Sequence, residues 1–318
     1  VIITGLVTKI ESINYYVKCE DKIYHCFLKG NFKKKFEYKK NKLITTDIVV
    51  VGDYVDFELN KEGFGLIHKI HKRKNYLSRK APRIKGATIK GSRLEQVLAA
   101  NIDNAIIVMS PKTPQFNNRT LDRYIVTAKA CNIPETIVIN KIDLADEDFK
   151  YWINLYQKTG HNIITVSATE NINIDKLKSL IDKKVSVFWG PSGVGKSSLI
   201  NTIYPQANLR VGDISDYTTK GRHTTVTAQL IEIEKDTYLI DTPGIREIEP
   251  FGVSQLDLGH YFNDIAKYIP DCKFNTCTHE HEPDCAVREA FYKGKISEER
   301  YLSYLNMLDS IEEDINYL

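Results

Sequence analysis

Short β-prone runs separated by turns dominate the first quarter of the chain. They cover Leu6 to Lys18, Lys22 to Leu28, Asp47 to Leu59 and Phe64 to Ile70, and helical periodicity is weak throughout. Turn signals stand at Gly52-Asp53 and Glu62-Gly63. This pattern predicts four or five strands that close into a small barrel. Residues 71–93 show no sustained period and contain Pro82, Gly86 and Gly91, which predicts a linker or flexible arm.

From residue 102 onward, apolar runs of strand length alternate with segments of helical spacing. The strand-like runs are Ile102–Met109, Thr136–Ile139, Ile163–Val166, Val185–Trp189 and Thr237–Ile240. The helical segments are Leu121–Ala130, Trp152–Lys158, Ile174–Ile181 and the stretch that begins at Ser198. This alternation predicts an α/β domain whose mainly parallel sheet has helices on both faces. Ligands of such sheets bind at the carboxyl ends of the strands.

Charge is distributed unevenly along the chain. The length of 318 residues favours two or three domains. Residues 1–93 hold 21 of the 44 Lys and Arg but 9 of the 41 acidic residues, so they carry about +12 and the remainder about −9. A basic module suggests a polyanionic partner such as RNA, and a lysine-rich solvated surface is the alternative. The lysine block at residues 32–40 includes Phe32 and Phe36, which either stack on bases or plug the barrel as a helix.

The sequence lacks both an apolar run long enough for a membrane span and the layout of a signal peptide. We therefore expect a cytoplasmic protein without a membrane partner. We also expect a monomer.

A phosphate-binding loop follows the strand-like run Val185–Trp189. The pattern G-x-x-x-x-G-K-[ST] occupies residues 190–197, between a strand and a helix as this loop requires. Its backbone N–H groups surround a phosphate, Lys196 reaches the β- and γ-phosphates, and the Ser197 hydroxyl holds Mg²⁺. The predicted nucleotide contacts here are Gly190, Pro191, Ser192, Gly193, Val194, Gly195, Lys196, Ser197 and Ser198.

A second motif, N-K-x-D, specifies guanine and follows the predicted strand that ends at Ile139. The carboxylate of Asp143 can accept hydrogen bonds from N1 and N2 of guanine, and adenine has no donors in that arrangement. Lys141 would lie along the base plane, and Asn140 would tie this loop to the phosphate loop. After the next strand, Ser167 and Ala168 fit the companion loop whose backbone N–H meets guanine O6.

Further Mg²⁺ and γ-phosphate contacts are expected downstream of the phosphate loop. Asp241 begins the string Asp-Thr-Pro-Gly at a strand end, where it can hold Mg²⁺ through water, and the Gly244 N–H can meet the γ-phosphate. A threonine in the polar stretch of residues 218–227 would complete the Mg²⁺ shell. We favour Thr225 over the adjacent Thr224, although the pattern alone does not separate them.

The order of these motifs is circularly permuted, since N-K-x-D and Ser-Ala precede the phosphate loop. With a basic barrel before this core and a Cys/His cluster after it, the chain resembles the ribosome small-subunit-dependent GTPase A family of bacteria. The resemblance spans the whole chain and includes residues 96–103 and 221–225. It implies an oligonucleotide-binding barrel, a permuted GTPase core and a zinc-bearing domain. Together these would bind the 30S subunit and its 16S rRNA during late maturation and hydrolyse GTP when the subunit stimulates them.

The residue that orients the attacking water is not in its usual place. Many GTPases carry a glutamine directly after D-x-x-G, but this chain has Ile245, whose aliphatic side chain cannot orient water. We predict that His223 supplies this role, as the resemblance also implies, and that intrinsic hydrolysis is slow. A contact between His223 and RNA or solvent alone is the alternative.

A zinc site is predicted in the last quarter of the chain. Three cysteines and a histidine fall within fourteen residues, in the spacing Cys272-x4-Cys277-x-His279-x5-Cys285. Four such ligands make a closed tetrahedral Zn²⁺ site with a structural role. His281 competes with His279 by proximity, and the family pattern matches His279. Leu256 to Tyr268 and Ser297 to Leu308 have helical spacing, so the metal would staple a small helical domain.

The complete interpretation is a GTP hydrolase, using Mg²⁺, on a permuted P-loop α/β core. The predicted barrel covers residues 1–75, the basic linker 76–93, the permuted core 94–249 and the helical zinc domain 250–318. A GTP-regulated RNA-binding scaffold with incidental hydrolysis is the non-enzymatic alternative. An ATPase or nucleotide kinase is a further alternative, and the Asn140–Asp143 motif argues against it.

Overall fold

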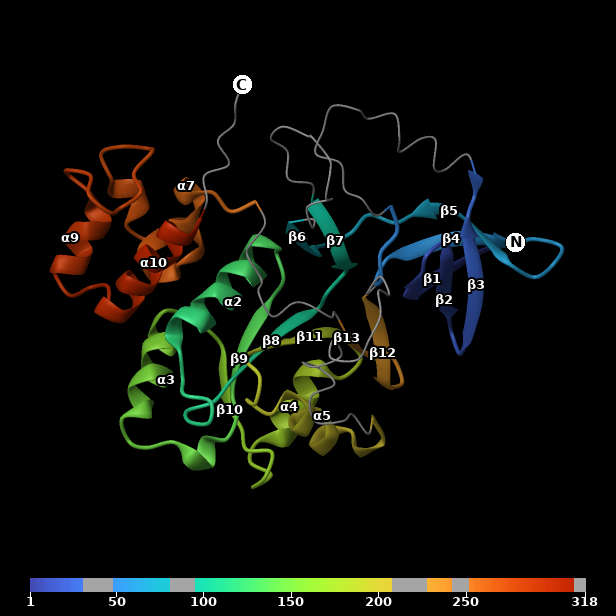
Figure 1. The fold of residues 1–318 in the computed structure, drawn as a ribbon, viewed down its shortest axis with the longest axis horizontal. Helices are drawn as coiled ribbons and strands as arrows, with labels where there is room; N and C mark the ends of the chain where they lie inside the picture. The colour runs from blue at the N-terminus through green and yellow to red at the C-terminus, as the bar shows by residue number, and fades with distance from the viewer. Residues whose placement is uncertain (31–47, 81–94, 208–227, 242–251, 312–318) are drawn as a thin grey trace, which may run out of the picture.

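The structure, a computed structural model, describes residues 1–30, 48–80, 95–207, 228–241 and 252–311 (Figure 1). Figure 1 shows the amino-terminal strands and the carboxyl-terminal helices on opposite sides of a central α/β layer. Within these residues, no helix combines the length and apolar character that a membrane crossing needs. The predicted aromatics Phe32 and Phe36 lie outside the described residues.

The amino-terminal module is a five-stranded barrel. Its strands are β1 (Ile2–Glu11), β2 (Asn14–Cys19), β3 (Lys22–Leu28), β4 (Tyr54–Leu59) and β5 (Gly65–Ile70). β1 pairs with both β2 and β4, and β5 pairs with both β3 and β4, which closes the barrel as predicted. The run from Leu6 to Lys18 was expected to be one unit, but Ser12 adopts a left-handed conformation (φ 58°) and turns the chain between β1 and β2.

The expectation of a linker after the barrel is wrong for Tyr76–Lys80. These residues form β6, which pairs antiparallel with β7 (Glu95–Ala100) in a separate two-stranded ribbon. The barrel contacts this ribbon at Gly52, whose φ is +86° and whose backbone lies so close that a Cβ atom would be 2.0 Å from the Ala100 carbonyl oxygen. The rest of the predicted linker, residues 81–93, lies outside the described residues.

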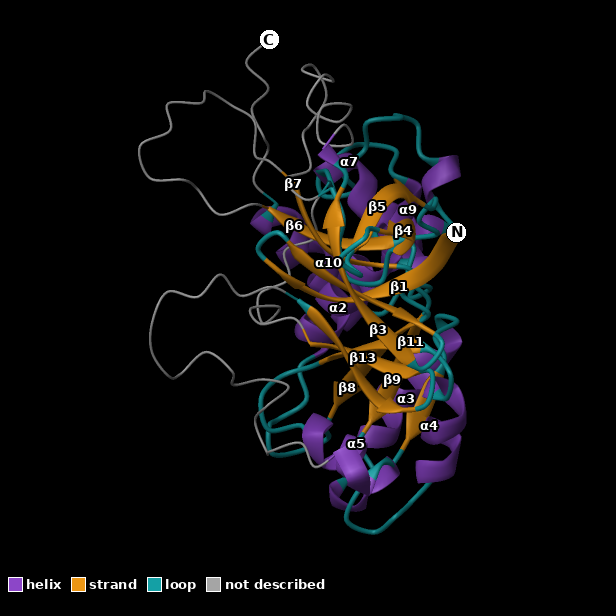
Figure 2. Ribbon diagram, turned by 90° about the vertical axis from the view of Figure 1, so that its right-hand side faces the viewer, coloured by secondary structure: helices purple, strands orange, loops and turns teal. Residues whose placement is uncertain are grey.

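The central sheet has the predicted parallel α/β form. Its strands are β8 (Asn104–Met109), β9 (Glu135–Ile139), β10 (Ile163–Thr165), β11 (Val185–Trp189), β12 (Gln229–Glu234) and β13 (Thr237–Asp241). The spatial order is β10-β9-β8-β11-β13-β12, in which β12 pairs antiparallel with β13 and the other neighbours are parallel. The barrel joins this sheet because β12 pairs antiparallel with β1 at Gln229 and Lys9. Figure 2 draws the strands of both in orange.

Helices cover both faces of the central sheet, so β8 and β11 are buried at every position and their successive residues point into opposite cores. The helices of this layer are α2 (Asn118–Ala130), α3 (Phe149–Lys158), α4 (Ile174–Ile181) and α5 (Lys196–Ile203), with short 3-10 turns η1 (Ile142–Leu144) and η2 (Pro205–Ala207). Ile107 and Met109 of β8 point into the core beneath α2 and α3. Ile106 and Val108 point into the opposite core, beneath α4 and α5.

The carboxyl-terminal module is a small helical domain. It contains α7 (Gln255–Leu258), η3 (Gly259–Tyr261), α8 (Asn263–Ala266), η4 (Ile269–Asp271), α9 (Ala286–Tyr292) and α10 (Glu298–Ser310). A helix was expected over Leu256 to Tyr268, but this stretch is broken into the four-residue helices α7 and α8. Val126 of α2 joins the apolar core of this domain, so the two modules share a packed boundary. The exact domain boundaries stay predictions.

Candidate active site

The carboxyl ends of the parallel strands bring the predicted nucleotide motifs to one edge of the sheet. Residues 140–143 follow β9, residues 167–168 follow β10, and residues 190–197 follow β11. Asp241 is the last residue of β13. Because β11 lies between β8 and β13, the phosphate loop sits at the middle of this edge, with the Asn140–Asp143 loop on one side of it.

Two glycines shape the phosphate loop. Gly190 has φ +142°, and a Cβ atom there would be 2.1 Å from the Val108 carbonyl oxygen. Gly195 has φ +93°, and its Cβ atom would be 2.4 Å from Nδ2 of Asn140. Any side chain would therefore separate the loop from its neighbours. α5 starts directly after Gly195, and its first N–H groups form the kind of helix terminus that binds anions.

Lys196 lies folded into this loop and is 7% exposed. Its Nζ donates hydrogen bonds to the carbonyl oxygens of Gly190 (2.8 Å) and Pro191 (2.9 Å). Val194 is fully buried in the apolar core and anchors the loop, and Ser197 is buried beside Lys196 in the first turn of α5. Ser192, Gly193 and Ser198 are exposed.

Asn140 and Lys141 link the loop after β9 to the phosphate loop. Nδ2 of the buried Asn140 donates to the Val194 carbonyl oxygen (2.8 Å), and its Oδ1 accepts from the N–H of Ala168 (3.3 Å). Nζ of Lys141 donates to the Gly193 carbonyl oxygen (2.8 Å). The predicted tie between the two loops is present, and Ala168 is part of it.

Asp143 is exposed at the mouth of this site, and Ser167 holds one of its carboxylate oxygens. The fully buried Ser167 donates from Oγ to Oδ1 of Asp143 at 2.5 Å. This bond orients the carboxylate, which keeps acceptor capacity for a ligand because an ionised carboxylate has about four lone-pair sites.

Four predicted site positions are not placed. His223, Thr225 and Gly244, together with the competing Thr224, lie outside the described residues, and so does Ile245. Of the predicted Mg²⁺ and γ-phosphate contacts, the structure therefore places Lys196, Ser197 and Asp241.

The loop between β8 and α2, residues 110–117, belongs to the same edge but carries none of the predicted contacts. The carbonyl oxygen of Thr113 accepts a second hydrogen bond from Nζ of Lys141 (2.6 Å). Ser110, which is 1% exposed, holds the loop by donating to the Pro114 carbonyl oxygen (2.9 Å). Backbone carbonyl contacts have no residue signature, and the position of this loop after a parallel strand was the available signal.

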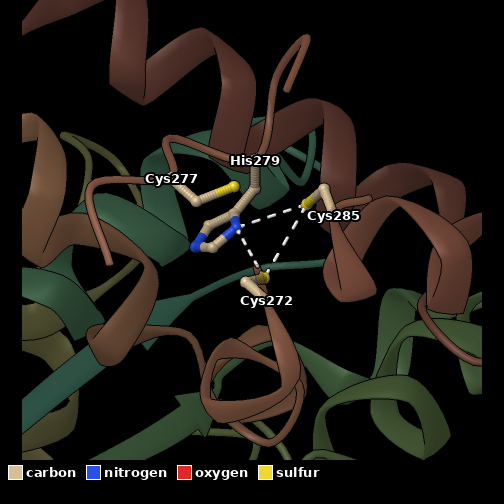
Figure 3. Close-up of side chains that lie close together, drawn as sticks. All are labelled: Cys272, Cys277, His279 and Cys285. Atoms are coloured by element: carbon tan, nitrogen blue, oxygen red, sulfur yellow. Dashed lines mark hydrogen bonds between the residues drawn. The ribbon is translucent and has the colours of Figure 1, made fainter. Parts of the chain in front are cut away.

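The four predicted metal ligands come together in the carboxyl-terminal domain (Figure 3). The ligand atoms of Cys272, Cys277, His279 and Cys285 all lie within 4.8 Å of one another. Nδ1 of His279 is 3.5 Å from the sulfur atoms of both Cys272 and Cys285. His281, the competing ligand, is exposed and pairs with Glu280 instead.

The surroundings of this cluster suit a structural metal. Burial raises the pKa of the Cys277 thiol to about 12, so the cluster is unlike a low-pKa reactive thiol. A bound cation reverses this preference, because it favours the thiolates. The backbone N–H of Arg288 points at the Cys285 sulfur (3.5 Å), and the Tyr301 hydroxyl holds the His279 carbonyl oxygen (2.6 Å). Three sulfur atoms and one nitrogen match the donor set of closed zinc sites.

Comparisons of sequence identify relatives over the whole chain. The RsgA N-terminal domain family matches residues 4–67, and the RsgA GTPase family matches residues 70–251. The small ribosomal subunit biogenesis GTPase RsgA of Phocaeicola vulgatus is 41% identical over 97% of both chains. The protein of that name from Flavobacterium johnsoniae is 36% identical, over 98% of this chain and 94% of its own.

Solved structures agree with this relationship. YjeQ from Thermotoga maritima is 30% identical, with a TM-score of 0.72 over 98% of both chains. YloQ, described as a circularly permuted GTPase, is 27% identical, with a TM-score of 0.69 over 98% of this chain and 95% of its own. The predicted fold class is thereby confirmed: a permuted P-loop core follows an amino-terminal barrel and precedes a region whose Cys3His cluster could bind zinc. By sequence and by fold, the chain belongs to the RsgA GTPase family and is a circularly permuted GTPase that hydrolyses GTP.

Proposed function

We propose that this GTPase binds the small ribosomal subunit through its 16S rRNA, acts late in subunit maturation, and hydrolyses GTP when the subunit stimulates it. The names of its relatives, which are biogenesis GTPases of the small ribosomal subunit, support the process. GTP binding is supported by one observation: the N-K-x-D loop is hydrogen-bonded to the phosphate loop. Asn140 donates to the Val194 carbonyl oxygen, and Ser167 orients the Asp143 carboxylate.

In this proposal each motif has one role. Asp143 accepts from N1 and N2 of guanine, Lys141 lies along the base, and the Ala168 N–H meets guanine O6. Residues 190–198 and Lys196 hold the phosphates. Ser197, Asp241 and Thr225 hold the Mg²⁺ that GTPases typically use, which stabilises charge on the transferred phosphoryl group, and Gly244 contacts the γ-phosphate. His223 orients the attacking water.

Comparing GTP turnover with and without 30S subunits tests the proposal. We expect slow turnover alone and a rise on adding subunits, because Ile245 cannot orient water. A His223→Ala variant should keep GDP affinity and lose the stimulated turnover. Turnover that subunits leave unchanged would favour the scaffold alternative, and an unchanged His223→Ala variant would remove His223 from the mechanism.

Guanine selectivity has a separate test at Asp143. An Asp143→Asn change replaces an acceptor by a donor, which no longer fits the guanine N2 amino group but fits the 2-oxo group of xanthine. The amide oxygen of asparagine can still accept from guanine N1, so the loss of one charged hydrogen bond of about 1.5–3 kcal/mol predicts GDP binding weakened by about ten- to a hundredfold. Binding of GDP and XDP by isothermal titration checks this, and unchanged GDP affinity would contradict the assignment.

The outer face of the barrel supplies a candidate RNA contact. Tyr15 and Tyr24 pack into the barrel core, so their neighbours Tyr16 and His25 face outward. Four half-buried rings form a continuous strip there. The centroids of Tyr16 and His25 are 5.4 Å apart, those of His25 and Phe27 4.8 Å, and those of Phe27 and Phe64 5.6 Å.

This strip fits stacking on unpaired bases. It lies on β2, β3 and the segment before β5, the region that oligonucleotide-binding barrels use. Nζ of Lys9 lies 5.6 Å from the Tyr16 ring, which puts a cation beside it. We expect Phe27→Ala to weaken binding of single-stranded RNA by about 1–3 kcal/mol. Tyr54→Phe, a change at an exposed barrel aromatic outside the strip, is the control, and equal affinity of both variants would remove the strip from the interface.

We further propose that Cys272, Cys277, His279 and Cys285 hold a structural Zn²⁺ ion, supported by their convergence and donor set. We also propose a cytoplasmic location, since its relatives are named for ribosomal subunit biogenesis, and a monomeric state, as expected from the sequence. Metal analysis giving about one zinc per chain and light scattering giving the monomer mass would agree with these proposals.

A further inference from the structure

A buried ion network joins the carboxyl-terminal domain to α2 of the GTPase core. Arg300 of α10 is 1% exposed, and its partners Asp122 of α2 and Asp264 of α8 are 0% and 6% exposed. The Arg300 guanidinium donates to both carboxylate oxygens of Asp264 at 2.9 and 3.1 Å, and also to Oδ1 of Asp122. The Tyr156 hydroxyl of α3 donates to the same Asp122 oxygen at 2.8 Å.

This network is stacked as well as hydrogen-bonded. The Arg300 guanidinium lies 4.6 Å from the Phe262 ring centre and 5.3 Å from that of Tyr156. Buried ion networks give little net stability, and apolar replacements are often neutral. The network therefore contributes less to stability than to fixing the relative position of α2, α8 and α10. The reason is that bidentate and stacked contacts hold a guanidinium in one geometry.

A second contact links the same elements one turn closer to the nucleotide site. Nδ2 of Asn118, the first residue of α2, donates to the carbonyl oxygen of Glu299 in the first turn of α10 (3.1 Å). The Tyr156 hydroxyl of α3, whose proton goes to Asp122, lies 3.4 Å from the Asn118 carbonyl oxygen as well. The amino-terminal turn of α2 is thus held by both α3 and the carboxyl-terminal domain.

The loop of residues 110–117, which contacts the nucleotide motifs, leads directly into that first turn of α2. Asn117 caps α2 by accepting from the Thr120 N–H (3.0 Å), and the Phe116 ring packs on Phe149 and Trp152 with centroids 5.2 and 5.0 Å away. Three residues earlier, the Thr113 carbonyl oxygen receives Nζ of Lys141. The position of α2 therefore determines where one of the two carbonyl partners of Lys141 lies.

We propose that Arg300 is a positioning residue for guanine-nucleotide binding: it clamps α2 so that residues 110–117 hold Lys141 against the base. This inference rests on the proposed role of Lys141 in binding the base. By linkage, a partner that shifts the carboxyl-terminal domain changes nucleotide affinity, and bound nucleotide changes the affinity for that partner by the same factor. A partner of the carboxyl-terminal domain would then change nucleotide binding through the guanine-binding loops as well as through the phosphate contacts.

The test separates the base-binding loops from the phosphate loop. GDP reports on both, whereas tripolyphosphate, which has no base, reports on the phosphate loop alone. For Arg300→Met in the full-length protein, we expect GDP affinity to fall about five- to tenfold while the affinity for tripolyphosphate stays unchanged. Zinc content and circular dichroism establish that the variant is folded.

Arg73→Met is the matched control. Arg73 also forms a two-pronged pair with a fully buried aspartate, donating to Oδ1 and Oδ2 of Asp53 at 2.7 and 2.8 Å, but it lies between β5 and β6 and holds the residue before β4 instead of α2. We expect this variant to bind GDP and tripolyphosphate as the wild type does. If Arg300→Met does not fold, the variant Asp122→Asn, Asp264→Asn, Arg300→Met replaces it, since it leaves no unpaired buried charge.

Three results would overturn the inference: unchanged GDP affinity in the folded variant, an equal loss for both ligands, or the same loss in Arg73→Met. Failure of the proposed function looks different. A wild-type protein that binds adenine nucleotides as well as GDP would contradict the guanine site itself, whereas a selective wild type with an unaffected Arg300→Met variant contradicts only the role of Arg300.

Discussion

At the scale of single residues, Gly195 shows how the phosphate loop depends on backbone geometry. An alanine there would place Cβ 2.4 Å from Nδ2 of Asn140 and would have to hold φ near +93°. Moving Asn140 away would break its bond to Val194, a loss of about 1–3 kcal/mol. We therefore expect Gly195→Ala to weaken GDP binding about tenfold or more, measured by titration calorimetry.

Gly63→Ala is the control for backbone strain. Gly63 has a similar φ of +86°, but a Cβ atom there meets nothing within 4 Å. This variant should lose stability by about 1 kcal/mol, because alanine resists positive φ, and should bind GDP normally. A comparable loss of GDP affinity in both variants would mean that general destabilisation, rather than the Asn140 contact, governs binding.

Asp56 gives a pH-dependent contribution to barrel stability. Burial alone would raise its pKa, but hydrogen bonds from His71, Thr4 and Lys69 outweigh burial and hold the pKa well below the ordinary 3.8. A lowered carboxyl pKa contributes stability that is complete above the unfolded-state pKa and is lost as the pH falls toward the folded-state pKa.

Asp56→Asn should therefore destabilise the protein by about 1–3 kcal/mol at pH 7. The difference from wild type should shrink below about pH 4, where the carboxylate becomes protonated in the unfolded chain. Urea denaturation at pH 7 and at pH 3.5 checks both statements. A difference that stays constant between these values would show that the charge of Asp56 is not what stabilises the barrel.

At the scale of elements, α7, α8 and α9 of the carboxyl-terminal domain are too short to be stable alone. α7 and α8 have four residues each and α9 has seven, whereas isolated helices shorter than about 12–15 residues are marginal in water. We expect Cys285→Ala to lose zinc and helical circular dichroism from this domain. The exposed His281→Ala is the matched control and should keep both, and full zinc content in Cys285→Ala would contradict the proposed ligand set.

Sequence patterns predicted those elements whose signal is local. Val185–Trp189 forms a strand at the predicted residues, because a fully buried central strand is apolar at nearly every position. Tyr76–Lys80 belongs to residues 71–93, which are predicted to be a linker because they show no sustained period and contain Pro82, Gly86 and Gly91; the strand form of Tyr76–Lys80 comes from pairing with β7. The break between α7 and α8 was missed because no proline interrupts Leu256 to Tyr268.

The same distinction separates the predicted parts of the site from the missed ones. Asn140, Lys141 and Asp143 were recognisable because specific side chains act at fixed spacing after a strand. The contact from Lys141 to Thr113 uses a backbone carbonyl, and Arg300 meets Asp122 across 178 residues. Neither contact leaves a pattern in the sequence, since it depends on which elements pack together.

At the scale of the whole molecule, the barrel and the GTPase core share an apolar core. Leu6 and Val51 of the barrel pack with Leu77 of the ribbon and with Ile102 and Ala105 of the GTPase core. Leu77 is 1% exposed, so Leu77→Ala should destabilise the protein by about 2–5 kcal/mol. Because the core is shared, both modules of the Leu77→Ala variant should unfold at a lower denaturant concentration than in the wild type.

Two probes report on the two modules. The tryptophans Trp152 and Trp189 report on the GTPase core, and amide exchange at Val55 and Phe57 reports on the barrel. Leu59→Ala, at a position 46% exposed, should leave both unchanged. If Leu77→Ala destabilised only the core signal, the barrel would be an independent unit.

The close approach at Gly52 limits how the barrel can be exchanged between relatives. Its carbonyl oxygen accepts from Nδ2 of Asn101 (2.8 Å), and the Ala100 N–H donates to the Val51 carbonyl oxygen (2.9 Å). A chimera that grafts a foreign barrel by cutting near residue 70 would pair a new turn with the old ribbon. Since no side chain fits at position 52, a working graft must bring its own glycine there and a ribbon of matching backbone path. The segment that must be exchanged as a whole is thus longer than the barrel, and it extends through Asn101.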